Sequence, residues 1–206
     1  MVRTLRLVLP IVVLAAIWLA MLMLGGGALD RQLYEGLYAG GSPALIEIAR
    51  GISLLGQPPV LITAGFICAL WLWRTGRGRL AVVLLVVTLI GRGLSELQKY
   101  EIGRVRPNLE PQLVVVKTSS FPSGHAASSM IFGLTMALAF AGGTKWERPA
   151  IAFAILLSLL IGTSRVMLGV HWPSDVVGGW SFGLLWVLLC FPLALRVAGP
   201  RRSPKN

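Results

Sequence analysis

Residues 149–166 read PAIAFAILLSLLIGTSRV, and this run decides the fold because its one charged residue, Arg165, stands next to its end. An α-helix needs about 20 mostly apolar residues to cross the hydrocarbon core of a bilayer. Runs of this kind recur along the chain, at residues 7–29, 58–73, 80–98, 125–142, 149–166 and 176–195. We therefore predict an all-α, polytopic bundle of six transmembrane helices, formed as one membrane-embedded domain over residues 1–206.

The composition supports this class. Apolar residues make up 55% of the 206 residues and charged residues 13%, and the mean hydropathy is +0.76, which disfavours a soluble globule. The first run also fits a secretory signal peptide, because Arg3 and Arg6 precede it and small residues follow it. Its apolar part is longer than the roughly 7–15 residues of a signal peptide, so an anchoring span is favoured.

The segment at residues 30–57 differs from the six runs, because charged and apolar residues alternate in it. This pattern is typical of a short amphipathic helical segment that lies on the membrane surface. Here we expect it on the outer leaflet, between the first two spans. Gly40-Gly41-Ser42-Pro43 should break it into two pieces.

The formal net charge of +11 would suggest nucleic acid in a soluble protein. Here the basic residues stand at the ends of apolar runs, so we predict a lipid bilayer and no nucleic acid as partner. Eleven of the 19 lie on the side that holds both chain ends, and three of the other eight are Lys99, Arg106 and Arg165. Because cytoplasmic loops carry the excess of Lys and Arg, we predict both termini in the cytoplasm of an inner (plasma) membrane protein.

Two cations follow the third run. Two basic residues near a span end are often interface anchors, but Arg92, Glu96 and Lys99 recur at i, i+4 and i+7 and so share one helical face. Ionisable residues at membrane depth usually face a cavity. Arg106 comes next, and Pro107 should end any helical continuation there. We expect Lys99 and Arg106 to face one anion.

A second motif, Pro122-Ser123-Gly124-His125, stands just before the fourth run. Ser123 is a plausible N-cap, and the free N–H groups of a first helical turn form an anion site. Gly124 would let a phosphate approach the backbone. The alternative is an ordinary capped helix start with His125 as a polar residue at the interface.

The third motif joins Arg165 to His171 and Asp175. Pro173 suits the first position of a helix, which would let Asp175 reach back to the imidazole and aim its other nitrogen as a nucleophile. A His–Asp pair that only satisfies itself is the alternative. Two histidines and one aspartate also suit a metal, but Lys99, Arg106 and Arg165 would repel a cation, so we predict an anion site and no metal.

Lys99…Arg106-Pro107, Pro122-Ser123-Gly124-His125 and Ser164-Arg165…His171…Asp175 together resemble the signature of the type 2 phosphatidic acid phosphatase superfamily. All eleven specified positions match, in order, within residues 99–175. The resemblance implies an integral membrane lipid phosphatase that needs no metal or other cofactor and works through a phosphohistidine.

The resemblance also implies roles for the matching residues. His171 would attack phosphorus, Asp175 would orient it, and His125 would protonate the leaving oxygen and then activate water. The phosphoryl oxygens would be bound by Lys99, Arg106, Ser123, Gly124 and Arg165. Undecaprenyl diphosphate, phosphatidylglycerol phosphate and phosphatidic acid are the implied lipid phosphate substrates. A non-catalytic six-span transporter or anionic-lipid-binding protein is the alternative.

Overall fold

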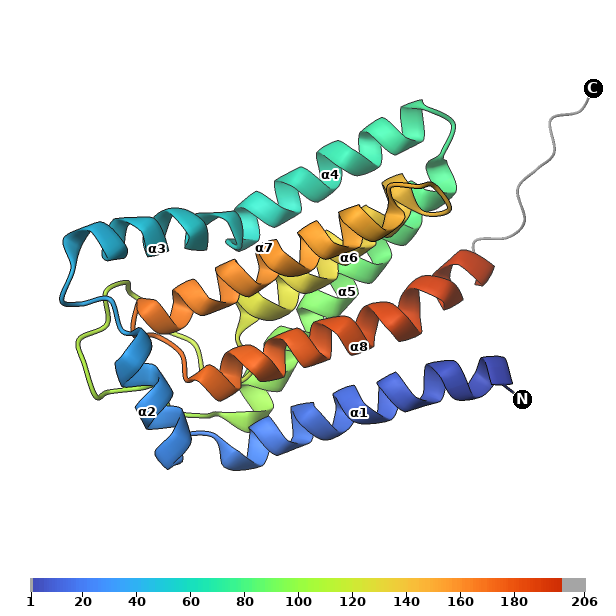
Figure 1. Cartoon of the computed structure of the whole chain (residues 1–206). Coiled ribbons are helices and arrows are strands. Elements are labelled where there is room, and N and C mark those ends of the chain that lie inside the picture. The colour runs from blue at the N-terminus through green and yellow to red at the C-terminus, as the bar shows by residue number, and fades with distance from the viewer. Residues whose placement is uncertain (1, 198–206) are drawn as a thin grey trace, which may run out of the picture.

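The chain is helical throughout the part that the structure describes. The computed structural model describes residues 2–197, and the side chains from residue 8 onward. Within that range every regular element is an α-helix, and the long helices lie roughly side by side in a bundle (Figure 1). Their bounds are α1 (Val2–Leu24), α2 (Ala28–Leu37), α3 (Pro43–Leu55), α4 (Pro58–Arg74), α5 (Gly78–Ile102), α6 (Gly124–Ala141), α7 (Glu147–Met167) and α8 (Pro173–Val197).

Four of the helices, α5 to α8, are each long and apolar enough to cross a membrane. The others form two bent pairs, in which α1 meets α2 at 91° and α3 meets α4 at 40°. The described residues thus hold four candidate spans, or up to six if each bent pair counts as one. The prediction of an all-α, multi-pass membrane protein is confirmed at this level.

Each of the six predicted runs coincides with one helix, although several ends differ. The first run was expected to reach residue 29, whereas α1 ends at Leu24, and a turn with Gly26 at a φ of 79° leads into α2. Segment 30–57 holds most of α2 and all of α3, and the break between them falls at the predicted glycines. Ser42 caps α3 by accepting a hydrogen bond from Leu45 N (3.4 Å). The position of segment 30–57 on the outer leaflet stays a prediction.

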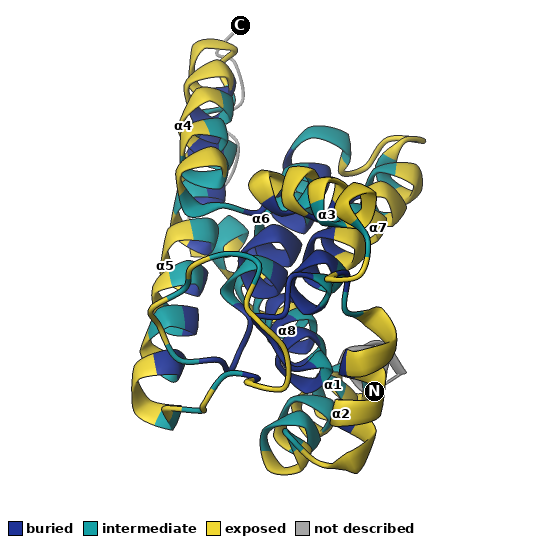
Figure 2. Cartoon of the chain, turned by 90° about the vertical axis from the view of Figure 1, so that its left-hand side faces the viewer, coloured by how far each residue is buried: buried dark blue, intermediate teal, exposed yellow. Residues whose placement is uncertain are grey.

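Helix α6 lies at the centre of the bundle, in contact with α4, α5, α7 and α8. Figure 2 shows the buried residues, in dark blue, concentrated on α6 and on the faces of its neighbours. A Cβ at Gly179 of α8 would lie 2.7 Å from Ser123 O, and one at Gly183 would lie 2.8 Å from Met130 Cβ. Small residues four apart let membrane helices approach closely. This contact brings the start of α6 against the start of α8, where Ser123 N donates to Asp175 O (2.9 Å).

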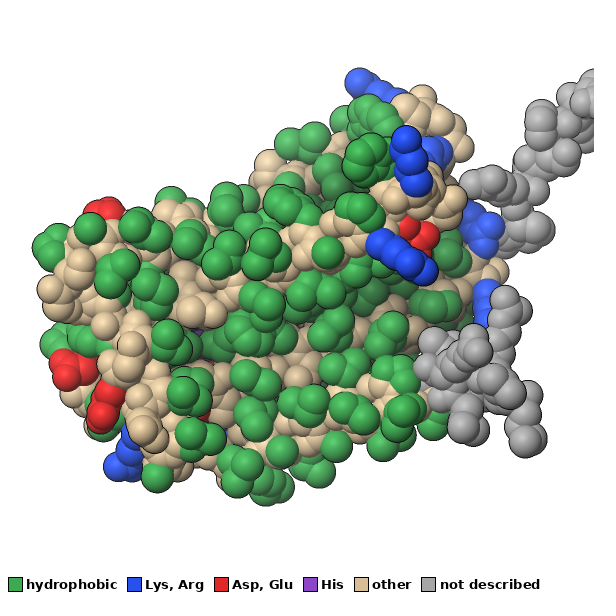
Figure 3. Space-filling model, in the orientation of Figure 1, with side chains coloured by type: hydrophobic (Ala, Val, Ile, Leu, Met, Phe, Trp, Pro, Cys, Tyr) green, Lys and Arg blue, Asp and Glu red, His purple; other side chains and the backbone are tan. Residues whose placement is uncertain are grey.

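The outside of the bundle is apolar along its length. Leu9, Phe66, Trp73 and Phe153 are among the large apolar side chains that are more than half exposed. On the face drawn in Figure 3, green apolar side chains cover the middle and charged side chains gather towards the two ends. Such a surface is suited to lipid rather than to water.

The two ends of the bundle differ in structure. The start of α1 and the end of α8 lie at one end, and α2, α3 and the long loop over residues 103–123 lie at the other (Figure 1). The loop runs from the end of α5 to the start of α6 and pairs with the α7–α8 connection, where Leu113 N donates to Leu168 O (3.0 Å). All three predicted motifs lie at this second end.

Candidate active site

The three motifs meet around one cavity of about 230 Å³. The predicted site residues that line it are Lys99, Arg106, Gly124, His125, Arg165 and His171. Its remaining wall is formed by Gly56, Pro58, Arg92, Glu96, Val116 and Thr118. Ser123 and Asp175 are fully buried, Ser123 next to the lining residue Gly124 in the chain and Asp175 against the lining residue His171.

The first two cations stand on either side of the end of α5. Lys99 lies in the last turn, with 5% of its surface exposed, and its ammonium donates to Ser119 O (3.0 Å). The helix ends at Gly103, which takes the left-handed conformation (φ 63°). We expected the run to end at residue 98 and Pro107 to stop any helical continuation. The helix stops between these two positions, because glycine ends a helix at little cost.

Arg106 is fixed by the loop that it precedes. Its Nε donates to Thr118 O (2.7 Å), its Nη2 donates to Ser119 O (3.1 Å), and its Nη1 donates to Val170 O. The same Nη1 lies 3.2 Å from His171 Nε2. The guanidinium is therefore held in one orientation, directly against the ring nitrogen that faces the cavity.

His171 and Asp175 form the predicted pair. His171 Nδ1 lies 3.4 Å from Asp175 Oδ2, and the two side chains are 3% and 0% exposed. Helix α8 begins at Pro173, as predicted, so Asp175 lies in its first turn and also accepts from Trp172 N (2.9 Å). The carboxylate favours a proton on Nδ1, which leaves the Nε2 lone pair facing Arg106 and the cavity.

Two further residues that the sequence reasoning missed hold Asp175. Ser120 Oγ donates to Asp175 Oδ2 (2.5 Å) and lies 3.4 Å from His171 Nδ1. Arg104 Nη1 forms an ion pair with Asp175 Oδ1 at 2.8 Å, with side chains 12% and 0% exposed. A buried carboxylate needs such partners, because an unpaired charge in a dry interior is strongly unfavourable. Asp175 is thus held in one orientation by Ser120 and Arg104.

Arg104 reaches further, to the end of α1. Its Nη2 donates to Met21 O (3.0 Å) and Leu22 O (2.5 Å), and its guanidinium lies 4.3 Å from the centre of the Phe121 ring. The last carbonyls of a helix lack partners within it. Arg104 therefore supplies donors to α1 and to Asp175 at the same time.

The second motif is placed as predicted, with one difference. Ser123 is the N-cap residue of α6, but its hydroxyl makes no capping hydrogen bond. Ser123 Oγ and His125 Nε2 are both buried with no hydrogen-bond partner among the described residues. Unpaired buried polar atoms call for a ligand or water, and these two lie at the start of α6, where backbone N–H groups favour an anion.

Arg165 completes the site from α7. It is 5% exposed and its Nη1 donates to Ser53 Oγ of α3 (2.6 Å), whereas its Nε has no partner among the described residues. No carboxylate is its partner in any described ion pair. A buried guanidinium with free donors at a cavity wall is suited to phosphate oxygens.

The charges around His171 fix its protonation. Burial lowers the pKa of His171 well below the usual 6.5, and the positive charges of Lys99, Arg106 and Arg165 lower it further. Burial also lowers the pKa of Arg106, although a guanidinium remains charged in proteins. The cavity thus combines a neutral imidazole with three cations, an arrangement that can bind a phosphoryl group and attack it.

Comparisons with known proteins agree with this geometry. Residues 79–197 match the family described as the PAP2 superfamily. Phosphatidylglycerophosphatase B of Bacillus subtilis is 33% identical over 71% of this chain and 74% of its own length. An undecaprenyl-diphosphatase of Sulfolobus acidocaldarius is 32% identical over 51% of this chain, which spans about half of that relative.

A solved structure extends the likeness to the fold. The crystal structure of a transmembrane PAP2 type phosphatidylglycerolphosphate phosphatase from Bacillus subtilis superposes with a TM-score of 0.82 at 28% identity. The superposition covers 91% of this chain and 96% of that one. Fold and site thus define an integral membrane phosphatase.

The chain belongs to the PAP2 superfamily, which confirms the resemblance seen in the motifs. It is a lipid phosphatase, a hydrolase of phosphate ester bonds, and the transporter alternative is set aside.

Proposed function

We propose that the chain removes the terminal phosphate from a membrane lipid phosphate or diphosphate in the cavity described above, with His171 as the nucleophile. The observation that carries this proposal is the line Arg104–Asp175–His171–Arg106. In this series of contacts the buried Asp175 carboxylate lies against His171 Nδ1, and the Arg106 guanidinium lies against His171 Nε2, where we propose that the phosphate binds. Lys99, Arg106 and Arg165 would bind the phosphoryl oxygens, with Ser123 and Gly124 at the start of α6.

The reaction would run in two steps. In the first, His171 Nε2 forms a bond to phosphorus as the bond to the lipid oxygen breaks, and His125 gives that oxygen a proton. In the second, His125 takes a proton from water, whose oxygen attacks the phosphohistidine and frees both inorganic phosphate and His171. Asp175 would stabilise the Nδ1 proton throughout, as in other nucleophile–base pairs.

The His125 position supports its role. Its Nε2 is buried and has no hydrogen-bond partner within the described part of the chain. Its ring is close to Gly56 at the α3–α4 junction, where a Cβ would lie 3.0 Å from His125 Cδ2. His125 reaches the cavity from the start of α6, whereas His171 reaches it from the α7–α8 connection. In-line displacement needs nucleophile and leaving group on opposite sides of the phosphorus.

The membrane arrangement is part of the proposal. We propose six spans, with α1–α2 and α3–α4 each counting as one, both termini in the cytoplasm and the site on the outer side of the inner (plasma) membrane. The distribution of Lys and Arg supports this orientation. We propose one domain over residues 1–206, since Arg104 ties the end of α1 to the site.

The test is phosphate release by detergent-purified protein from phosphatidic acid, phosphatidylglycerol phosphate and an isoprenyl diphosphate such as undecaprenyl diphosphate. We expect turnover that EDTA leaves unchanged and that vanadate inhibits, because vanadate copies five-coordinate phosphorus. Loss of activity in EDTA with recovery on adding a divalent cation would contradict the proposal. It would instead favour a metal held by His125, His171 and Asp175.

A further inference from the structure

The phosphate cavity has a second charged pair that the catalytic proposal leaves unused. Arg92 and Glu96 of α5 both line it, and Arg92 Nη2 lies 3.7 Å from Glu96 Oε1. Their side chains are 25% and 41% exposed. Neither belongs to the three motifs, and among the described side chains this long ion pair is the one polar contact that either makes.

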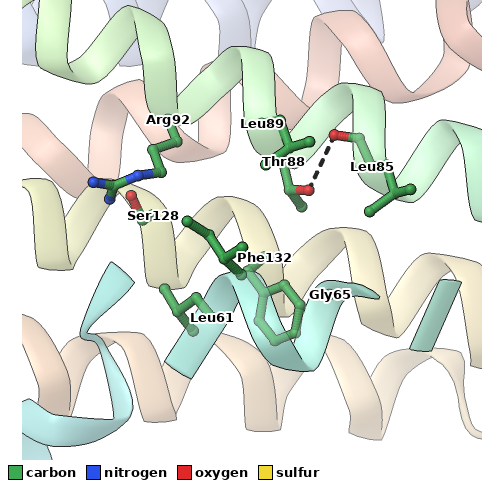
Figure 4. A pocket seen from close by; sticks show the side chains of 9 residues that line it. Leu61, Gly65, Leu85, Thr88, Leu89, Arg92, Ser128 and Phe132 are labelled. Atoms are coloured by element: carbon green, nitrogen blue, oxygen red, sulfur yellow. Dashed lines mark hydrogen bonds between the residues drawn. The ribbon is translucent and has the colours of Figure 1, made fainter. Parts of the chain in front are cut away.

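The residues around the cavity define its two ends. Arg106 and His171 lie in contact at one end, under the loop that follows α5. Arg92 lies at the other end, because it also lines a separate, mainly apolar pocket between α4, α5 and α6. Figure 4 shows Arg92 beside Ser128 at the edge of that pocket, with Leu61, Phe132 and Leu85 beyond them.

Glu96 lies between the two ends. A Cβ on Gly124 would lie 3.3 Å from Glu96 Oε1 and 3.3 Å from Lys99 Cε. Its carboxylate is therefore next to Gly124 at the start of α6, the helix that carries His125. Along α5 the charges run plus at Lys99, minus at Glu96 and plus at Arg92, a rise of about 10 Å over seven residues.

From the phosphate end inwards, the cavity wall thus offers cations, then the Glu96 carboxylate and then the Arg92 cation. The apolar side chains beyond Arg92 belong to the separate small pocket. The matching ligand has a phosphate monoester, then a hydroxyl group that donates a hydrogen bond, then a second phosphate, and then apolar chains. A diphosphate has no such hydroxyl, and its second phosphate would follow directly and approach the Glu96 carboxylate.

We propose that Arg92 and Glu96 form a leaving-group subsite that selects lipids in which a glycerol with a free hydroxyl joins two phosphates, over lipid diphosphates. This inference rests on the proposed function of the same cavity. Arg92 binds the phosphodiester that remains on the lipid, and Glu96 accepts the hydrogen bond of the glycerol hydroxyl. Phosphatidylglycerol phosphate has this chemistry, whereas phosphatidic acid lacks the second phosphate.

The test compares three substrates on the purified full chain in detergent: phosphatidylglycerol phosphate, phosphatidic acid with the same acyl chains, and farnesyl diphosphate. Arg92→Gln should lower kcat/KM for phosphatidylglycerol phosphate about tenfold or more, the effect of one charge-assisted hydrogen bond. The kcat/KM of this variant for phosphatidic acid should stay within about threefold of the wild-type value, which also shows that the variant is folded. Arg92→Lys should fall between Arg92→Gln and wild type.

The second variant tests the carboxylate. Glu96→Gln keeps an acceptor for the hydroxyl but removes the charge, so the preference for phosphatidylglycerol phosphate over farnesyl diphosphate should fall about tenfold. Lys117→Gln is the matched control, because it removes an exposed charge beside the cavity mouth and should change no preference.

Equal losses on phosphatidylglycerol phosphate and phosphatidic acid in Arg92→Gln would overturn the inference, as would an unchanged preference in Glu96→Gln. Either result would leave the lipid phosphatase itself intact. A wild-type protein that hydrolyses none of the three lipids would contradict the proposed function instead.

Discussion

Replacing Arg104 by methionine is expected to lower kcat while leaving KM almost unchanged. Arg104 does not line the cavity, and its effect passes through Asp175, to which it is joined at 2.8 Å, with side chains 12% and 0% exposed. Losing one hydrogen bond between charged groups costs about 1.5–3 kcal/mol. If that cost appears in the transition state, where Asp175 must support the charge on His171, kcat falls about 10- to 150-fold.

The pH profile separates this role from a purely structural one. Without the guanidinium, the negative charge of Asp175 acts on His171 uncompensated, which favours the protonated imidazole and moves the acid limb of kcat to higher pH. Kinetics with phosphatidic acid in detergent between pH 4 and 9 would show both effects. Arg50→Met is the matched control, since its ion pair with Glu47 is exposed and such pairs contribute little. A kcat within about threefold of wild type and an unmoved acid limb would refute the reasoning.

Three further outcomes are expected. Because burial and nearby cations hold the pKa of His171 well below 6.5, wild-type kcat should stay level as pH falls to 6.5 and decline only below it; a decline that begins above pH 7 would contradict the charge arrangement. Gly179→Ala should lower the melting temperature in detergent, since its Cβ would lie 2.7 Å from Ser123 O, whereas Gly93→Ala, with nothing within 4 Å, should not; overpacking costs about 1–3 kcal/mol. Val115→Cys, with both native cysteines replaced, should react with an impermeant thiol reagent in intact cells, and labelling only after lysis would reverse the proposed orientation.

The spans could be predicted from the sequence, because a helix that crosses a bilayer needs a long apolar run whatever its tertiary partners are. The runs at residues 80–98 and 149–166 fall within α5 and α7, and each helix extends them by only a few residues. The angles between α1 and α2 and between α3 and α4 were not predicted, because the local sequence does not reveal that α2 and α3 pack against α7.

The cavity residues could also be predicted from the sequence. Phosphate is bound by a cation, a histidine or a helix start, and few of these occur in so apolar a chain. Arg104 and Ser120 were missed for the opposite reason. They contact Asp175 from 71 and 55 residues away, and nothing in their local sequence separates them from an interface cation or a loop serine. Gly103, which ends α5, was a usable signal in the local sequence.

The central claim is that phosphorus is carried on His171, and rapid quenching with a ³²P-labelled lipid phosphate tests it most directly. The protein should acquire a label that is stable in alkali and lost in acid, as expected for phosphohistidine, and peptide mapping should place it on His171. His171→Ala should acquire no label and release no phosphate while remaining folded in the membrane. A label on any other residue, or phosphate release by His171→Ala within about tenfold of wild type, would contradict the account, since covalent catalysis does not survive loss of its nucleophile.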